Sequence, residues 1–250
     1  MRDQRTSMGM PVVIDIVDGN STMQDIDDLF NYFEHIEQIF SPYRETSETC
    51  RINRNEILPK NYSDEMKEIL TLAEKTKRET NGFFDIEIIP GKINPVGIVK
   101  GWAIYNAAKI LEKKGFKNFY VDIGGDIQTS GLNHENKKWQ IGIRNPFNHE
   151  IGQELIKVVY LSGEGIATSG NYLRGNHIYN PFNQNEKLDH SISFSVIGPN
   201  VYEADRFATA AFAMDKKGIY FIEKLSGFEG YAVDKHGQAT MTSNFELYTK

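Results

Sequence analysis

The chain has very little cysteine. Cys50 is the only one among 250 residues, which excludes an intramolecular disulfide framework and a metal cluster built on several thiolates. Positive charge is also scarce, because 28 lysines and arginines stand against 34 acidic residues and the formal net charge is −6. No long basic run occurs. Nucleic-acid-binding proteins need a basic surface, so the sequence predicts no nucleic-acid partner.

Long apolar runs are absent as well. No stretch approaches the roughly 20 apolar residues that a membrane-spanning helix needs. The segment from Met1 to Met8 lacks the apolar centre of a signal peptide, and no cysteine follows it that could carry a lipid. The sequence therefore predicts a cytoplasmic protein without a membrane anchor.

The composition is typical of a compact enzyme domain, with 40% hydrophobic and 25% charged residues. No internal repeat and no Pro/Gly-rich linker interrupts the chain, which favours a single domain over residues 1–250. Hairpin-like strands mix irregularly with helices. This order predicts an α+β fold, a largely antiparallel sheet with packed helices, rather than regular βαβ winding.

Periodicity and turn residues predict the order of the elements. A strand over 11–17 precedes a helix that starts at Ser21 or Thr22, and Ser63 caps a second helix that runs through residue 76. The segment 41–58, rich in Ser, Thr, Arg and Asn, is expected to be an irregular functional loop. Further strands are expected at 84–89, near Val121 and Ile127, at 139–143, 157–161 and 191–197, and near Tyr231 and Ala239, with a turn at 91–97 and helices from Lys100 to Leu111, from Glu203 and over 217–225.

A carboxylate and a hydroxyl are spaced by four residues in the predicted helix that starts at Glu203. Positions four apart lie one turn apart on the same helix face, so Asp205 and Thr209 are expected side by side. Both side chains offer the hard oxygen ligands that Mg²⁺ prefers. An aspartate near a helix start also commonly serves only as a cap or a first-turn charge. The pair alone leaves both interpretations open.

Three segments upstream are also unusual. Lys100 lies between a glycine-bearing run and a predicted helix, where a lysine and free first-turn amides can bind a phosphate. The spacing of a Walker phosphate loop is absent, so an exposed lysine is the simpler interpretation of this segment alone. Gly124-Gly125 permits either a tight hairpin or the close approach of another group. The third segment is Ala167-Thr168-Ser169-Gly170, with His177 seven residues after it.

Taken together and in this order, the motifs resemble those of the ApbE family, the FAD:protein FMN transferases. The resemblance runs from about Met8 to Met241, and the order of the motifs is preserved. The segments that carry it are Met8-Gly9, Ser41-Pro42-Tyr43 with Ser47-Glu48 and Asn53, Gly82-Phe83-Phe84-Asp85, Lys100-Gly101, Gly124-Gly125-Asp126, Ala167-Thr168-Ser169-Gly170, His177, and Ala204-Asp205 with Thr209.

The resemblance implies a single mixed α/β sandwich and a Mg²⁺-dependent reaction. FMN would pass from FAD to a Thr or Ser hydroxyl of an acceptor flavoprotein, with release of AMP. By resemblance, Asp205, Thr209 and the backbone carbonyl of Gly97 would hold Mg²⁺. Lys100 would neutralise phosphate charge, and His177 would be the base for the acceptor hydroxyl. The resemblance assigns FAD contacts, besides Lys100, to Met8, Tyr43, Phe83, Phe84, Asp85, Asn94 and Tyr179, with Tyr43 stacking on a flavin or adenine ring.

One position departs from the family pattern. Where the family has His-x-x-Asp-Pro, this chain has His177-Ile178-Tyr179-Asn180-Pro181. An aspartate that orients the histidine would raise its basicity, and Asn180 has the same shape without the charge. Two alternatives stay open. One is hydrolysis of FAD to FMN and AMP, with water in place of the acceptor hydroxyl, and the other, suggested by Asn180, is a non-catalytic protein that binds or delivers flavin.

Overall fold

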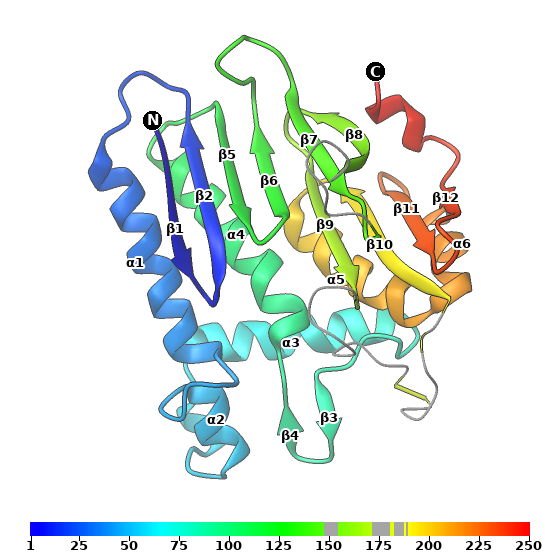
Figure 1. Cartoon of the computed structure of the whole chain (residues 1–250). Coiled ribbons are helices and arrows are strands. Elements are labelled where there is room, and N and C mark those ends of the chain that lie inside the picture. The colour runs from blue at the N-terminus through cyan, green and yellow to red at the C-terminus, as the bar shows by residue number, and fades with distance from the viewer. Residues whose placement is uncertain (148–154, 172–180, 183–187, 189) are drawn as a thin grey trace.

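An antiparallel sheet of eight strands forms the centre of the fold (Figure 1). The computed structural model describes residues 1–147, 155–171, 181–182, 188 and 190–250. The order of the strands across the sheet is β1-β2-β5-β6-β9-β10-β11-β12. They span Arg2–Ser7 (β1), Met10–Ile16 (β2), Phe119–Ile123 (β5), Asp126–Ser130 (β6), Gly165–Gly170 (β9), Ser191–Gly198 (β10), Glu229–Asp234 (β11) and Ala239–Met241 (β12).

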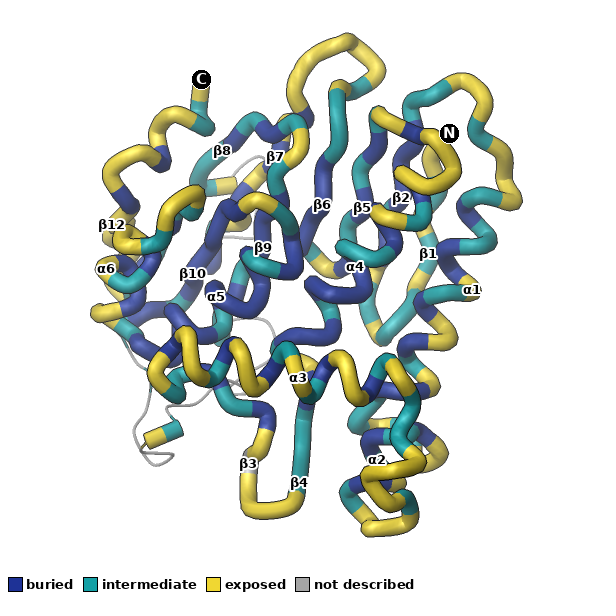
Figure 2. The backbone as a smooth tube through the Cα atoms, turned by 180° about the vertical axis from the view of Figure 1, so that it is seen from behind, coloured by how far each residue is buried: buried dark blue, intermediate teal, exposed yellow. Residues whose placement is uncertain are grey.

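Helices cover one face of this sheet (Figure 2). α4 packs on β5 and β6, α5 packs on β9 and β10, and α4 and α5 pack on each other. α3 runs across the lower end of the sheet in Figure 1. The described residues contain six α-helices: Met23–Phe40 (α1), Glu48–Asn53 (α2), Asp64–Glu79 (α3), Val96–Lys113 (α4), Val201–Ala213 (α5) and Gly218–Ile222 (α6).

Two small hairpins complete the fold. Trp139–Arg144 (β7) pairs with Leu155–Leu161 (β8), and their side chains share a hydrophobic cluster with residues of β6, β9, β10 and β11. Glu87–Ile89 (β3) pairs with Lys92–Ile93 (β4) in a hairpin that projects below the sheet (Figure 1).

Alternation along the strands decides which residues face the helices. In β10, Phe194 and Val196 pack with α5, whereas Ile197 packs with the β7–β8 hairpin. In β9, Ala167 packs with α5 and Ile166 with the hairpin. Successive side chains of a strand point to opposite faces. The hydroxyl at position 169 therefore shares the helix-covered face with Ala167.

Several predicted elements are confirmed. α1 starts after Thr22, whose side chain and Asp25 form a capping box, and α3 starts after Ser63, which accepts a hydrogen bond from the Met66 amide over 3.1 Å. Gly124-Gly125 is the tight turn between β5 and β6 and has φ values of +62° and +99°. These values suit glycine best. The predicted α+β class with a large antiparallel sheet is also confirmed.

Other element predictions are wrong in part. The segment 41–58 is not wholly irregular, because it contains α2, capped by Ser47. The predicted turn at 91–97 contains β4 and the start of α4. The predicted strand at 84–89 shortens to β3, and the helix at 217–225 shortens to α6. β1 and β9 were not expected. None of the helices in the described part of the chain combines the length and hydropathy needed to cross a bilayer.

Candidate active site

Gly101 of α4 and Asp205 of α5 touch at the centre of the candidate site. The Gly101 amide donates a hydrogen bond to Asp205 Oδ2 over 2.8 Å, and Asp205 is only 4% exposed. A Cβ atom at position 101 would lie 2.6 Å from the Asp205 Cβ and 2.8 Å from the carbonyl oxygen of Val201. Only glycine lets the two helices approach this closely, so the residue after Lys100 sets where the Asp205 carboxylate lies.

Lys100 reaches from α4 to the first residue of β6. Its Nζ lies 2.5 Å from Oδ2 of Asp126, whose side chain is 1% exposed. The other oxygen of Asp126 accepts a hydrogen bond from the Thr168 amide of β9 over 3.0 Å. The sequence predicts Lys100 at the entrance of a helix. Because α4 begins at Val96, Lys100 instead lies within the helix. The lysine therefore starts from a rigid backbone.

Three neutral oxygens come together beside this ion pair. Thr209 Oγ1 lies 3.4 Å from the carbonyl oxygen of Gly97 and 3.4 Å from Ser169 Oγ. Ligand oxygens about 2.1 Å from a Mg²⁺ ion lie roughly 3 Å from one another, so these separations are close to what one ion needs. Hydroxyl, carbonyl and carboxylate oxygens are also the donors that Mg²⁺ prefers.

The site holds an excess of buried negative charge. Burial, and then the charge of Asp126, raise the pKa of Asp205 well above its ordinary value, while the Lys100 ammonium opposes the rise. Two buried carboxylates face one ammonium, so a proton or a cation must offset the remaining charge. Among the described residues, no group of three or more His, Cys or acidic side chains is placed to hold a metal. An ion here would rely on the carboxylate of Asp205, hydroxyls and a carbonyl, and this donor set fits Mg²⁺.

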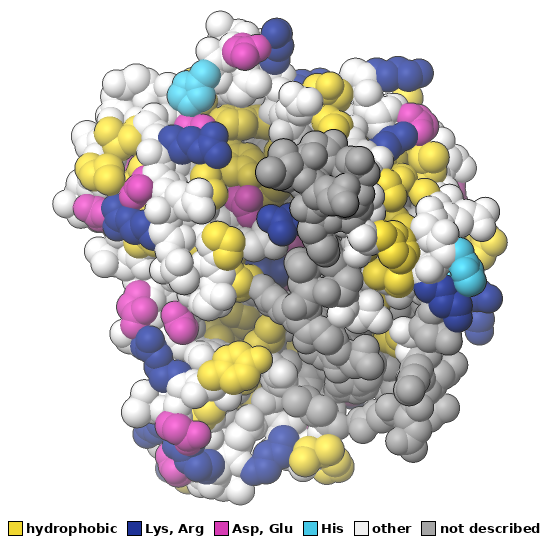
Figure 3. All heavy atoms as spheres, viewed as in Figure 1, with side chains coloured by type: hydrophobic (Ala, Val, Ile, Leu, Met, Phe, Trp, Pro, Cys, Tyr) yellow, Lys and Arg dark blue, Asp and Glu magenta, His cyan; other side chains and the backbone are white. Residues whose placement is uncertain are grey.

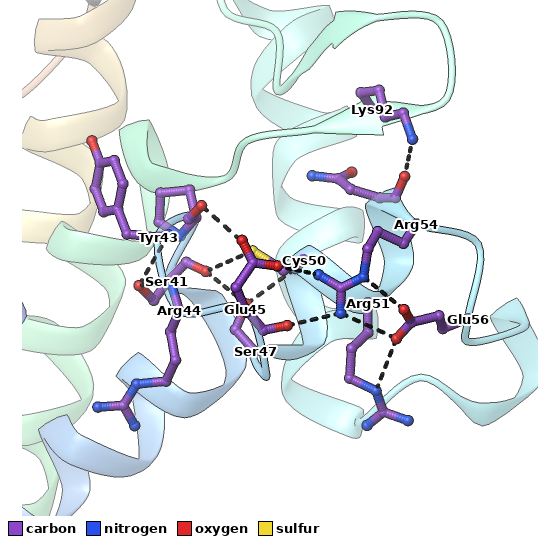
Figure 4. Close-up of polar contacts among 12 residues, drawn as sticks. Ser41, Tyr43, Arg44, Glu45, Ser47, Cys50, Arg51, Arg54, Glu56 and Lys92 are labelled. Atoms are coloured by element: carbon purple, nitrogen blue, oxygen red, sulfur yellow. Dashed lines mark hydrogen bonds and ion pairs between the residues drawn. The ribbon is translucent and has the colours of Figure 1, made fainter.

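The residues expected to contact FAD occupy very different environments. Tyr43, between α1 and α2, is 91% exposed, and its ring points away from the surrounding polar contacts in Figure 4. Asn94 precedes α4, where its Oδ1 accepts a hydrogen bond from the Val96 amide over 3.2 Å. Met8 forms the β1–β2 turn with Gly9 and packs partly buried against the core. The side chain of Tyr43 is therefore the one most open to a ligand among these.

Phe83, Phe84 and Asp85 form the approach to the β3–β4 hairpin. The Phe83 ring makes an edge contact with Phe182 at 5.0 Å between centroids. Phe84 is 3% exposed, and its ring would lie 3.4 Å from a Cβ atom at Gly97. Asp85 pairs with the Lys77 ammonium at 2.6 Å. The Phe84 side chain therefore packs against the first turn of α4, whereas Phe83 is only partly buried.

The site residues predicted in the segment around position 180 lie outside the described residues. These are His177 and Tyr179, together with Asn180, the departure from the family pattern. Figure 3 shows one face of the molecule, viewed as in Figure 1, where acidic and basic side chains lie beside hydrophobic ones in a hollow near its middle.

Two described residues join the site that were not assigned to it from the sequence. Asp126 contributes to the resemblance only as part of Gly124-Gly125-Asp126, and Ser169 only as part of Ala167-Thr168-Ser169-Gly170. The sequence does contain a signal for Asp126. A two-glycine turn fixes the side of the sheet to which the next side chain points, and Asp126 directly follows such a turn. For Ser169 the alternation of β9 would have sufficed, had that strand been expected.

Comparison with known proteins now identifies the family. The model of the ApbE family matches residues 8–92 and 90–232. The chain belongs to the ApbE family. Two solved structures share its fold across nearly the full length of both chains: the flavin transferase ApbE from Vibrio cholerae, with a TM-score of 0.86, 20% identity and coverage of 99% of this chain and 98% of that one, and the ApbE protein from Thermotoga maritima, with a TM-score of 0.84, 21% identity and coverage of 100% and 99%.

Two curated relatives are similar to this chain at lower coverage. A protein of Klebsiella pneumoniae (strain 342) is 27% identical over 151 residues, which are 57% of this chain and 43% of that protein. A protein of Chlamydia muridarum (strain MoPn / Nigg) is 27% identical over 237 residues, 71% of this chain and 72% of that protein. Both are named FAD:protein FMN transferase. The match spans less than half the length of the Klebsiella protein.

Proposed function

We propose that this ApbE-family protein is a Mg²⁺-dependent FAD:protein FMN transferase. The observation that carries the proposal is the convergence of Lys100, Asp126 and Asp205 with three neutral oxygens where α4 and α5 meet β6 and β9. Phosphoryl transfer from a pyrophosphate needs cations beside the phosphates and little covalent chemistry from the protein. A buried acidic site with one lysine supports that requirement, and the names of the curated relatives support FAD as the substrate.

Each described residue then has a role. Asp205, Thr209 and the Gly97 carbonyl would hold Mg²⁺, which when bound would neutralise charge on the pyrophosphate. Lys100 would contact the same phosphates, held in direction by Asp126. Tyr43 would stack on one of the two rings of FAD, an aromatic contact worth about 1 kcal/mol. Met8, Phe83, Asp85 and Asn94 would line the remainder of the FAD site.

The reaction exchanges one P–O bond for another. The oxygen of a Thr or Ser side chain on the acceptor flavoprotein attacks the phosphorus of the FMN half, and the bond from that phosphorus to the AMP oxygen breaks. His177 takes the proton of the attacking hydroxyl, and AMP leaves with the bridging oxygen. If water takes the place of the acceptor hydroxyl, the same steps give FMN and AMP.

Mass spectrometry of one incubation separates the candidates. The protein is mixed with FAD, Mg²⁺ and a flavoprotein that carries a Thr/Ser flavinylation motif. An FMN adduct on the acceptor with release of AMP is the expected result. Free FMN with AMP would favour hydrolysis, and unchanged FAD would favour a carrier and overturn the proposed transfer.

A pair of aspartate variants tests the metal assignment in the same assay. Asp205→Ala should lose Mg²⁺-dependent turnover, because it removes the carboxylate from the proposed ion site. Asp64→Ala is the matched control, since Asp64 is an exposed first-turn helix residue with no place in the site. Unchanged Mg²⁺ dependence in Asp205→Ala would show that this aspartate is not a ligand of the ion and serves only the contact with the Gly101 amide.

A further inference from the structure

Tyr43 combines an exposed ring with a fixed backbone. Its side chain is 91% exposed, while its amide and that of the next residue both donate hydrogen bonds to Ser41 Oγ, over 3.3 and 3.2 Å. The carbonyl of Ser41 in turn accepts a hydrogen bond from Ser47 Oγ over 2.6 Å (Figure 4). A solvent-exposed aromatic ring on a backbone held this closely is suited to receive a flat ligand at little ordering cost.

Further hydrogen bonds within residues 41–54 stabilise this turn. The Cys50 thiol donates to the carbonyl of Pro42 over 3.4 Å. Arg54 donates both to the carboxylate of Glu45 and to its backbone carbonyl, each over 2.8 Å, as the dashed lines in Figure 4 show. We name residues 41–54 the tyrosine platform. These hydrogen bonds hold its residues together as one unit.

One side chain joins the tyrosine platform to β4. The carboxamide of Asn53 donates from Nδ2 to the carbonyl of Ile93 over 2.9 Å, and its Oδ1 accepts from the Ile93 amide over 2.9 Å. The amide group thus pairs with β4 as a neighbouring strand would, across a sequence separation of 40 residues. The Lys92 ammonium donates to the backbone carbonyl of Asn53. Both polar backbone groups of Ile93 depend on this contact.

Ile93 lies at the end of β4, shortly before the helix α4 that carries Lys100, the proposed phosphate contact. Asn94 follows it and accepts a hydrogen bond from the Val96 amide in the first turn of α4. That turn carries Gly97, and the next carries Lys100. The tyrosine platform and the start of α4 are therefore connected through the short path Asn53–Ile93.

We infer that Asn53 is a positioning residue that sets the ring of Tyr43 at the correct distance from the phosphate-binding part of α4. This inference rests on the proposed function. FAD is a long ligand, and its rings and its pyrophosphate must be bound at the same time. The parts of the protein that bind the rings and the pyrophosphate must therefore be held at a fixed distance from each other. Asn53 fixes this distance by joining the tyrosine platform to β4. It does so without contact to FAD and therefore acts through Tyr43.

A double-mutant cycle on FAD binding tests this inference. The dissociation constant for FAD with Mg²⁺ is measured for the native protein, Asn53→Ala, Tyr43→Ala and the double variant. We expect each single variant to bind FAD about five- to tenfold more weakly, and the double variant to bind no more weakly than the weaker single variant, because coupled residues are non-additive. Asn133→Ala is the matched control. The side chain of Asn133 makes three loop hydrogen bonds at the other end of the sheet, between β6 and β7, and its removal should leave FAD binding unchanged.

Additional measurements keep the outcomes distinct. Thermal unfolding of every variant shows whether it is folded, and Asn53→Asp, which retains the acceptor for the Ile93 amide, replaces Asn53→Ala if that variant does not fold. Three outcomes would each overturn the inference. They are native FAD affinity in the Asn53 variant, native FAD affinity in Tyr43→Ala, and additive losses of affinity in the double variant. Failure of the native protein to bind FAD would instead overturn the proposed function.

Discussion

The ammonium of Lys100 and the carboxylate of Asp126 lie 2.5 Å apart, and the carboxylate is almost wholly buried. A buried ion pair is costly to assemble and costly to break from one side. This ion pair lies beside the Asp205 carboxylate and fixes the direction of the Lys100 side chain.

Asp126→Asn should therefore reduce FMN transfer more than it reduces FAD binding. The amide keeps the shape and can still accept the hydrogen bond from the Thr168 amide, but Lys100 loses its charged partner. A charge-assisted hydrogen bond contributes roughly 1.5–3 kcal/mol, so a fall in kcat of about tenfold or more is expected in steady-state kinetics. Asp18→Asn is the control, since Asp18 also accepts backbone amides, those of Lys117 and Asn118, away from the site. A native kcat in Asp126→Asn would show that the pair does not position Lys100.

Gly101→Ala should destabilise the protein and weaken Mg²⁺ binding together. The added Cβ atom would overlap with the Asp205 Cβ and the Val201 carbonyl, both closer than 3.0 Å, so α4 and α5 must separate. Overpacking of this kind costs about 1–3 kcal/mol, which thermal unfolding detects as a fall of several degrees in Tm. Gly19→Ala adds a Cβ atom to open space and should leave Tm close to native. Equal Tm values for the two variants would contradict the close contact.

The metal-free protein should lose stability as pH rises. The pKa of Asp205 is raised in the folded state by burial and by the charge of Asp126. Its contribution to folding is therefore complete below the ordinary aspartate pKa of about 4 and is lost as pH rises through the raised value. In calorimetry with a chelator present, Tm of the native protein should fall over this range relative to Asp205→Asn, in which the titration is removed. Parallel curves for the two proteins would rule out this titration as a source of instability.

His177→Ala should retain FAD binding and lose transfer. A general base contributes about 10²–10⁴-fold to rate and need not contribute to affinity, so a drop of that order in the rate of FMN transfer is expected with an unchanged dissociation constant for FAD. Asn180→Asp should be at least as active as the native protein, because an aspartate would raise the basicity of the histidine. Transfer at the native rate by His177→Ala would place the base elsewhere.

The sequence predicts most of the fold where local chemistry and burial agree. The capping residues Thr22 and Ser63 mark the starts of α1 and α3, and Gly124-Gly125 marks a hairpin that only positive φ values allow. β1 was missed because its sequence, RDQRTS, contains no aliphatic side chain. Within the described part of the chain its only sheet neighbour is β2, so pairing with β2 and not hydrophobic alternation makes it a strand.

The candidate site was predictable in its parts but not in its assembly. The spacing of Asp205 and Thr209 shows that they share a face of one helix, and the family resemblance points to Lys100. Nothing local indicates that Lys100 meets Asp126 or that Gly101 meets Asp205, because these contacts depend on how α4 crosses α5 and β6. The link from Asn53 to Ile93 is likewise a product of tertiary packing.

The contacts that build the site join distant parts of the chain. Gly101 and Asp205 are 104 residues apart, Gly97 and Thr209 are 112 apart, and Asp126 and Thr168 are 42 apart. Contacts of such long range require that large loops be closed, at a cost in chain entropy. A ligand of this site binds only chains whose folding is complete, and by mass action it raises their share of the population. Occupancy of the site is thus also a measure of how much of the chain has reached its native topology.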